Sequence, residues 1–179
     1  MDRNMDSGVR KAALTDSSSA IILFKAGLFN QFAEHYRIIM SGSVFSELTC
    51  GNHAGAVDFT AWCKCGKIQI TNTKPCNSTG LDQSLQNLGA GERDTILLFY
   101  CGSGALVVID DGKGAVFCRD NDIPYINALL VPRILYIAGR VSEDERERFL
   151  NAITGLGRYS QSVIDYARNC DDAVLDPFV

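Results

Sequence analysis

The sequence predicts an α/β fold built on a mainly parallel sheet. Short apolar stretches of strand length alternate along the chain with longer stretches of helical length, and this alternation is typical of parallel sheets covered by helices. The 179 residues correspond to about one domain. Hydrophobic residues make up 46% of the chain and charged residues 21%, which is the composition of a folded globular protein.

The first half of the chain predicts three strands with helices between them. Asp16 closes the first strand and is followed by three serines, which are good residues for opening a helix. The stretch from Lys67 to Thr71 alternates polar and apolar residues, which indicates a half-exposed strand at a sheet edge. We expect strands at residues 12–15, 36–40 and 67–71 and helical segments at residues 20–27, 28–35, 43–49 and 54–64.

The second half begins with a loop at residues 72–80, where Asn, Thr, Pro, Ser and Gly are crowded together. Residues 105–109 are apolar on both faces, as expected for a strand inside a parallel sheet. Ser142 and Glu145 form a capping box that predicts a helix start. We expect helices at 81–100, broken at 89–91, and at 113–120, a strand at 123–126, and two or three helices within 128–169.

The charge balance and the apolar runs exclude two classes of protein. The chain has 17 Lys plus Arg against 21 Asp plus Glu, a net charge of −4, which argues against a broadly basic nucleic-acid binder but leaves room for a local basic patch. No apolar run approaches the ~20 residues of a membrane span. Residues 1–11 read as a polar tail without a secretion signal. We therefore expect a cytoplasmic protein whose seven cysteines are reduced.

Acidic residues follow the predicted strands or open the helices beside them. In a parallel sheet the carboxyl ends of the strands meet at one edge, where sites form. Carboxylates gathered there repel one another unless cations neutralise them, and Mg²⁺ or Mn²⁺ favours such oxygen ligands. The acids in these positions are Asp16, Glu47, Glu92, Asp94, Asp110 and Asp111.

Each acid taken alone has a simpler explanation as a helix cap, a turn residue or a solvated side chain. Three other kinds of site fit less well. A dinucleotide fingerprint at Gly112 and Gly114 would need glycine where Phe117 stands. A haloacid-dehalogenase-like phosphatase would need Asp in place of Ser18, and the phosphate-binding P-loop motif is absent from the sequence.

Five segments in the right order make the sequence resemble the PIN-domain nucleases, especially their small prokaryotic single-domain branch. The similarity spans roughly residues 12–135, and its specificity lies in the ordered sum of the segments. They are Leu14-Thr-Asp16-Ser-Ser-Ser-Ala-Ile-Ile, Val44-Phe-Ser-Glu47-Leu, Gly91-Glu-Arg-Asp94-Thr-Ile-Leu-Leu, Leu106-Val-Val-Ile-Asp110-Asp111-Gly-Lys-Gly-Ala and Ile123-Pro-Tyr-Ile-Asn-Ala-Leu.

The resemblance implies a three-layer α/β/α fold and a pocket of acids that binds one or two Mg²⁺ or Mn²⁺ ions and hydrolyses phosphodiester bonds, usually in RNA. It also implies a catalytic set of Asp16, Glu47, Asp94 and Asp111, with Asp110 and Glu92 as neighbouring metal ligands. The family's Gly-Glu-x-Glu form favours Asp94 over Glu92 as the ligand. Ser17 or Ser18 would hold a phosphate or a metal-bound water.

Two functions from different classes follow. One is a metal-dependent ribonuclease acting as the toxin of a toxin–antitoxin pair, which forms a homodimer and binds an antitoxin protein. The alternative is a PIN-like protein that has lost catalysis and binds protein or RNA. In both, residues 12–179 form one PIN-like domain in which residues 140–179 are a helical C-terminal part.

The cysteines offer a different metal site. Cys50, His53, Cys63 and Cys65 could supply four zinc ligands, although the Cys-x-Cys spacing of the second pair is tighter than is usual in structural zinc sites. Unpaired cysteines also pack in cores as small hydrophobic residues, and that interpretation is favoured here.

Overall fold

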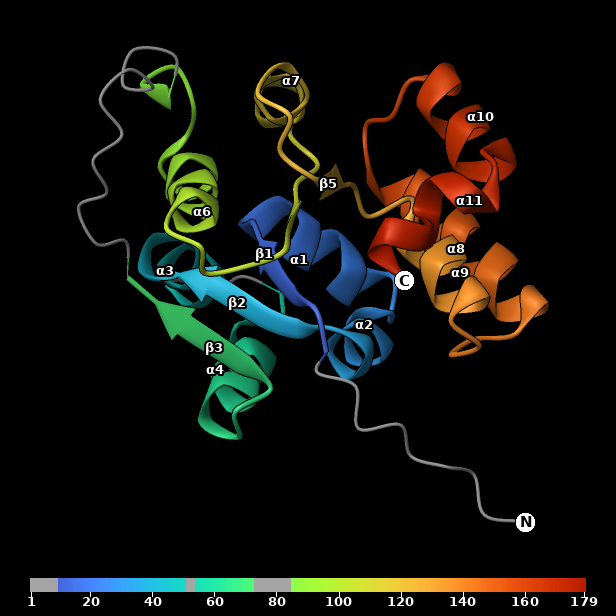
Figure 1. Cartoon of the computed structure of the whole chain (residues 1–179). Helices are drawn as coiled ribbons and strands as arrows, with labels where there is room; N and C mark the ends of the chain where they lie inside the picture. The colour runs from blue at the N-terminus through green and yellow to red at the C-terminus, as the bar shows by residue number, and fades with distance from the viewer. Residues whose placement is uncertain (1–9, 51–53, 73–84) are drawn as a thin grey trace.

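A five-stranded parallel sheet lies at the centre of the computed structural model, which describes residues 10–50, 54–72 and 85–179 (Figure 1). The strand order is β3-β2-β1-β4-β5, and every neighbouring pair is parallel. The predicted parallel α/β fold is therefore confirmed, with the expected half-exposed strand at one edge. The strands are β1 (Ala12–Thr15), β2 (Arg37–Ser41), β3 (Ile68–Thr71), β4 (Leu106–Val108) and β5 (Tyr125–Ile126).

The helices fall close to the predicted segments, with boundaries moved by their capping residues. The first helix begins at residue 17 and not at 20, because the Asp16 side chain accepts a hydrogen bond from the Ser19 amide and caps it. The predicted capping box of Ser142 and Glu145 opens α9. The helices are α1 (Ser17–Lys25), α2 (Phe29–His35), α3 (Gly42–Thr49), α4 (Ala56–Lys64), α6 (Ala90–Tyr100), α7 (Gly112–Asp120), α8 (Val131–Ile137), α9 (Glu143–Leu156), α10 (Gln161–Asn169) and α11 (Asp172–Leu175), before the 3-10 turn η1 (Asp176–Phe178).

The inner strands of the sheet are buried on both faces, so most of their residues are apolar, whereas the edge strand β3 is only partly buried. Successive side chains of a strand point to opposite faces. Ala13 and Met40 join a core cluster with α1, α2, α8 and α9, whereas Leu14 and Ile39 join a second cluster with α6 and α7. This arrangement is the three-layer α/β/α fold that the resemblance implied.

Parts of the earlier predictions fall outside the described residues, namely residues 1–9 of the polar tail and most of the predicted loop at 72–80. Five described cysteines, including the buried Cys118 and Cys170, are free thiols as expected. Cys101 is disulfide-bonded, so the expectation of reduced thiols does not hold for it. In the described part of the chain, no helix combines the length and apolarity that a bilayer crossing requires.

Candidate metal site at the carboxyl edge of the sheet

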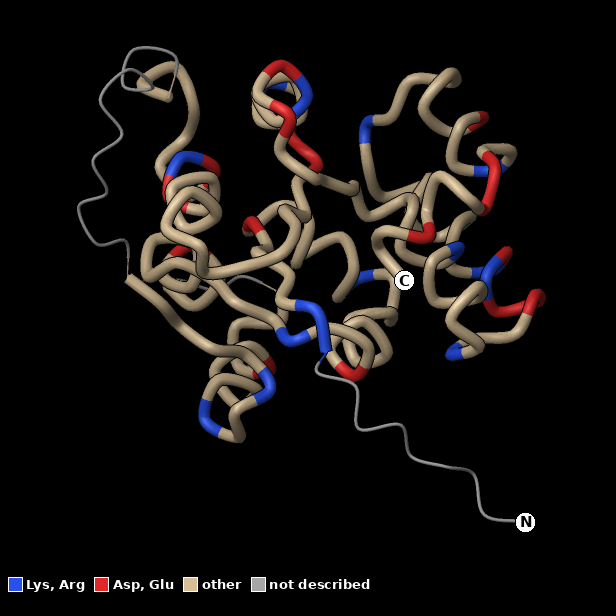
Figure 2. The backbone as a smooth tube through the Cα atoms, in the orientation of Figure 1, with Lys and Arg blue, Asp and Glu red and all other residues tan. Residues whose placement is uncertain are grey.

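Four helices begin at the carboxyl edge of the sheet. Helices α1, α3 and α7 start directly after β1, β2 and β4. Helix α6 also starts at this edge, because a Cβ added at its Gly91 would lie only 3.1 Å from Glu47 Oε2 of α3. Each helix N-terminus carries a partial positive charge, which favours acidic side chains. The charge map shows an acidic stretch just before α7 and acidic residues at the start of α6 (Figure 2).

Asp16 is the most buried acid of the site, with 2% of its surface exposed. Its Oδ1 accepts a hydrogen bond from the Ser19 amide at 2.8 Å, and its Oδ2 accepts one from Ser18 Oγ at 2.7 Å. The pKa of the Asp16 carboxyl is raised to about 7, chiefly by burial and to a lesser extent by the nearby charge of Asp110, while the serine hydrogen bonds act in the opposite direction. The ionised form of the Asp16 carboxyl is therefore poorly solvated in the folded chain.

Glu47 belongs to the same edge through α3. Its Oε2 accepts a hydrogen bond from Ser17 Oγ at 2.6 Å, which joins the first turn of α1 to the middle of α3. Gly91 lets α6 approach this carboxylate, because a side chain at position 91 would also lie 3.2 Å from Val44 Cγ2. Close packing of α6 against α3 thus explains the glycine at position 91.

Glu92 lies between the acids of α3 and α7. Burial raises the pKa of the Glu92 carboxyl, and the negative charges of Asp111 and Glu47 raise it as well. The Gly89 amide and Lys113 oppose this rise. Asp111 caps α7, its Oδ1 accepting the Lys113 amide at 2.8 Å. Glu92 is therefore close enough to both Glu47 and Asp111 for their negative charges to act on its own carboxyl.

Asp110 follows β4 and is tied to the C-terminal half of the chain. It accepts hydrogen bonds from the Ala128 amide, at 3.1 Å to Oδ2, and from the hydroxyl of Tyr159 to Oδ1. Burial raises the pKa of the Asp110 carboxyl, and the Tyr159 hydroxyl is the strongest influence in the opposite direction. Asp110 lies beside Asp16, because the Asp16 amide donates to Val108 O of β4 at 3.1 Å.

Asp94 has different neighbours from Glu92, although both belong to α6. Its Oδ2 accepts a hydrogen bond from Ser43 Oγ at 2.6 Å, and its Oδ1 lies 4.0 Å from Arg93 Nε. Ser43 precedes Glu47 by one helical turn on α3, so Asp94 borders the cluster. The sequence favoured Asp94 over Glu92 as a ligand, whereas the surroundings of Glu92 contain more acidic neighbours.

The chemistry of this cluster suits a hard divalent cation. All of its charged donors are carboxylate oxygens, which Mg²⁺ and Mn²⁺ prefer. The hydroxyl of Thr15, directly before Asp16, is buried with no hydrogen-bond partner among the described residues. Among residues 10–50, 54–72 and 85–179, no three His, Cys, Asp or Glu side chains already stand close enough to hold a metal. The donor set fits such an ion by its chemistry.

The described residues do not bring the cysteines of the proposed zinc site together as metal ligands. Cys50, Cys63 and Cys65 are free, and they form no metal-holding group within the described ranges. Cys65 Sγ instead lies 3.4 Å from Trp62 O as a weak donor. His53, the fourth ligand of that hypothesis, lies outside the described residues.

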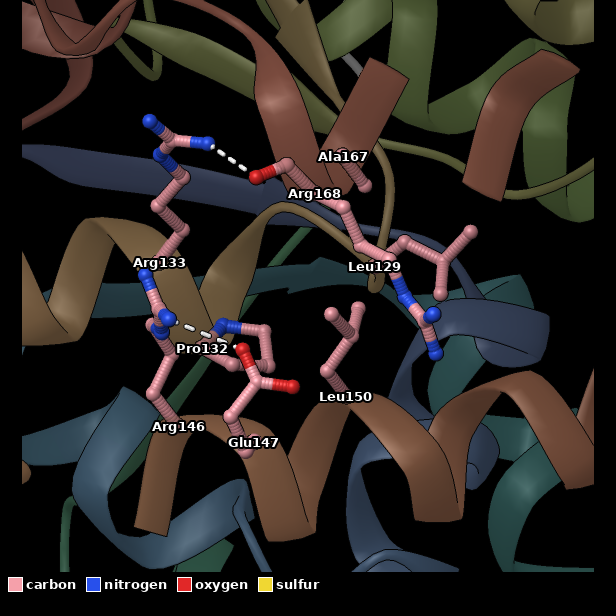
Figure 3. A pocket seen from close by; sticks show the side chains of 8 residues that line it. All are labelled: Leu129, Pro132, Arg133, Arg146, Glu147, Leu150, Ala167 and Arg168. Atoms are coloured by element: carbon pink, nitrogen blue, oxygen red, sulfur yellow. Dashed lines mark hydrogen bonds and ion pairs between the residues drawn. The ribbon is translucent and has the colours of Figure 1, made fainter. Parts of the chain in front are cut away.

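A second charged cluster lies among the C-terminal helices, around a cavity of about 10 Å³ (Figure 3). Arg133 Nη2 pairs with Asp172 at 2.8 Å, and its Nη1 donates to Arg168 O at 2.7 Å. Arg146 Nη2 pairs with Glu147 at 2.8 Å. The guanidinium groups of Arg133 and Arg146 thus have partners within the chain.

Several contributors to the acidic edge were missed by sequence reasoning. Ser43 and Tyr159 carry no signal in one dimension, because their partners lie 51 and 49 residues away in the chain. Thr15 directly precedes Asp16 and Ser19 follows it by three residues, so the sequence marks them only as neighbours of a strand-ending acid. Ser17 and Ser18 were expected near the site, and both donate to its carboxylates.

The fold and the acids at its carboxyl edge define a nuclease-like α/β domain. A family model described as a PIN domain matches residues 12–164. The chain belongs to the PIN-domain family, whose members are generally nucleases. Searches of curated proteins and of solved structures gave no match.

Proposed function

We propose that this chain is a ribonuclease that depends on Mg²⁺ or Mn²⁺ and hydrolyses phosphodiester bonds at the carboxyl edge of the sheet. One observation carries the proposal. The acidic cluster consists of Asp16, Glu47, Glu92, Asp110 and Asp111, and part of it is buried or half-buried. None of the ion pairs formed among the described residues includes a member of this cluster. Gathered carboxylates without a protein cation favour an external one.

In this proposal Asp16, Glu92, Asp110 and Asp111 hold the cation, with Glu47 beside them, and Asp94 is the further candidate that the sequence supplies. When bound, Mg²⁺ or Mn²⁺ lowers the pKa of water and stabilises a departing oxygen. The chain's own residues complete the site. In this proposal Glu47, whose Oε2 accepts a hydrogen bond from Ser17 Oγ at 2.6 Å, accepts a proton from the attacking water.

The RNA phosphate needs positive charge close to these acids. Lys113 lies in the first turn of α7, one residue beyond Gly112 and two beyond Asp111, and its side chain is exposed. The backbone amides at the N-terminus of α7 add a partial positive charge in the same place. We assign phosphate binding to this turn, which makes a local basic contact on an acidic chain.

The alternative is a PIN-like binding module that has lost catalysis. Its specific support is that Asp94, Glu47 and Asp16 already accept serine hydroxyls, which satisfy the carboxylates without a cation. The toxin role, the antitoxin partner and the homodimer remain predictions drawn from the resemblance.

The test combines a binding and a cleavage measurement on the full chain. Mn²⁺ affinity is measured from the spin-resonance signal of free Mn²⁺, and cleavage is followed on a mixed single-stranded RNA pool with Mn²⁺, with EDTA as the control. We expect wild type to bind Mn²⁺ and cleave. Asp16→Asn should lose both, whereas the exposed Asp144→Asn should keep both. A wild type that neither binds Mn²⁺ nor cleaves RNA in its presence would favour the binding module.

A further inference from the structure

Tyr159 connects the C-terminal helices to the acidic edge. It lies in the link between α9 and α10, and its hydroxyl donates a hydrogen bond to Asp110 Oδ1 across 49 residues of sequence. The Ala128 amide approaches the same carboxylate, at 3.1 Å from Oδ2 and 3.3 Å from Oδ1. The direction of the Asp110 side chain is therefore fixed from two separate elements.

Gly157 makes room for the Tyr159 ring. A Cβ at position 157 would overlap the ring and come within 2.7 Å of its Cζ atom. The backbone of Gly157 is extended, with φ −95° and ψ 166°, which any residue can adopt. The glycine at this position is thus explained by the close approach of the ring and not by backbone conformation.

The carboxylate that Tyr159 holds is the neighbour of the most buried acid. Asp16 and Asp110 leave the adjacent strands β1 and β4, which pair Thr15 with Val108. The buried Ser19 lies on the first turn of α1 after Asp16. Each carboxylate oxygen of Asp110 has two lone pairs, so its present hydrogen bonds leave acceptor capacity for a further ligand.

We propose that Tyr159 is a positioning residue of the metal site, which orients Asp110 beside Asp16 for cation binding. The inference rests on the proposed function and adds to it a residue from outside the acidic set. Hydrogen bonds from outer groups to ligating carboxylates orient them, and losing one typically costs about 10–100-fold in metal affinity or activity. Gly157 makes room for the Tyr159 ring, and the hydroxyl on that ring makes the contact with Asp110.

The first experiment removes the hydroxyl alone. In Tyr159→Phe, the dissociation constant for Mn²⁺ should rise about 10–100-fold, measured from the free Mn²⁺ signal, while the KM for RNA at saturating Mn²⁺ stays unchanged. Tyr166→Phe is the matched control, because Tyr166 is 50% exposed on α10, and it should bind Mn²⁺ like wild type. The melting temperature of each variant without metal is recorded alongside.

A double-mutant cycle tests whether Tyr159 acts through Asp110. Groups that act as one unit give non-additive effects. In an Asp110→Asn background, Tyr159→Phe should therefore cause no further loss of Mn²⁺ affinity. An equal loss in both backgrounds would show that Tyr159 acts by another route and would overturn the inference.

A second pair of variants moves the ring and leaves the hydroxyl in place. Gly157→Ala should weaken Mn²⁺ binding as Tyr159→Phe does, because the ring must shift. Gly155→Ala is the control, since a Cβ at Gly155 meets no atom within 4 Å. If wild type binds Mn²⁺ and both Tyr159→Phe and Gly157→Ala bind it equally well, the inference about Tyr159 is wrong while the proposed function still stands. A wild type that binds no Mn²⁺ overturns the proposed function and this inference together.

Discussion

The acidic edge of the sheet differs from the arginine cluster, formed by Arg133 and Arg146 among the C-terminal helices, in whether the charges are paired. In the arginine cluster, Arg133 has a short ion pair with Asp172. Arg146 has one with Glu147 (Figure 3). At the acidic edge, Asp16 and Glu92 have hydroxyl or amide donors but no ion pair in the described part of the chain. Paired charges are typical of a structural role, whereas unpaired charges of one sign need a ligand.

The contrast extends to the pKa values. Burial raises the pKa of Asp16, Glu92 and Asp110 in the acidic edge. These groups hold protons more tightly in the folded chain than in the unfolded one. The folded protein therefore tolerates the acidic edge at a cost in stability that a bound cation would remove.

The largest expected effect is the pH dependence that Asp16 brings. Its pKa rises from 3.8 to about 7 on folding, so the folded state binds more protons between these values. The free energy of unfolding should fall as pH rises from about 4 to about 7 and stay level above, and the full effect corresponds to roughly 4 kcal/mol as an upper bound. Asp16→Asn should flatten this slope, as measured by urea unfolding in EDTA from pH 4 to pH 8.

Mn²⁺ sharpens the same comparison. At pH 8 the ion should raise the unfolding midpoint of wild type, because it binds only the folded state, and should leave that of Asp16→Asn unchanged. Asp144→Asn is the control and should follow wild type at every pH. Identical pH slopes in wild type and Asp16→Asn would contradict the assignment of a buried, proton-binding Asp16.

The next effect separates the two acids of α6. Glu92 is surrounded by Glu47 and Asp111, whereas Asp94 bonds to Ser43 at 2.6 Å. We expect Glu92→Gln to lower kcat/KM for RNA by more than ~100-fold, beyond the usual range for groups outside the ligand shell. Asp94→Asn should lower it by about 10–100-fold. The reverse order, in steady-state cleavage with Mn²⁺, would return the ligand role to Asp94, as the sequence favoured.

A smaller effect is expected in the arginine cluster, and it should change stability only. The Arg133 side chain is 15% exposed and binds both Asp172 and Arg168 O. Arg133→Met should lower the free energy of unfolding by about 1–3 kcal/mol, because it leaves these acceptors unpaired. Cleavage per folded molecule should be unchanged. A loss of Mn²⁺ affinity in this variant would break the separation of the two clusters.

The smallest effect belongs to an exposed ion pair. Arg119 and Asp120 are paired at 3.0 Å with side chains 65% and 56% exposed. Exposed pairs contribute little, so Arg119→Met should change the free energy of unfolding by less than about 0.5 kcal/mol. Chemical denaturation beside Arg133→Met gives the comparison, and a change as large as that of Arg133→Met would be the contradicting outcome.

The strands and most helices were predictable because their signals are local. Residues 105–109 are apolar on both faces, which is typical of a strand covered by helices on both sides. Ser142 with Glu145 specifies a helix start by local hydrogen bonds. The placement of Asp16 and Asp110 at one edge also followed, because the carboxyl ends of parallel strands meet. Element order alone was enough for these features.

Tertiary structure decided which acids meet and what else surrounds them. Glu92 and Asp94 are two residues apart on one helix, and only packing against α3 and α7 distinguishes their surroundings. Tyr159 reaches Asp110 from 49 residues away, and the hydroxyl donors to Glu47 and Asp94 come from other helices. The sequence by itself determined the family, the parallel sheet and the acidic edge, because local patterns encode them. The partners of each carboxylate depend on contacts between distant elements, which only the folded chain establishes.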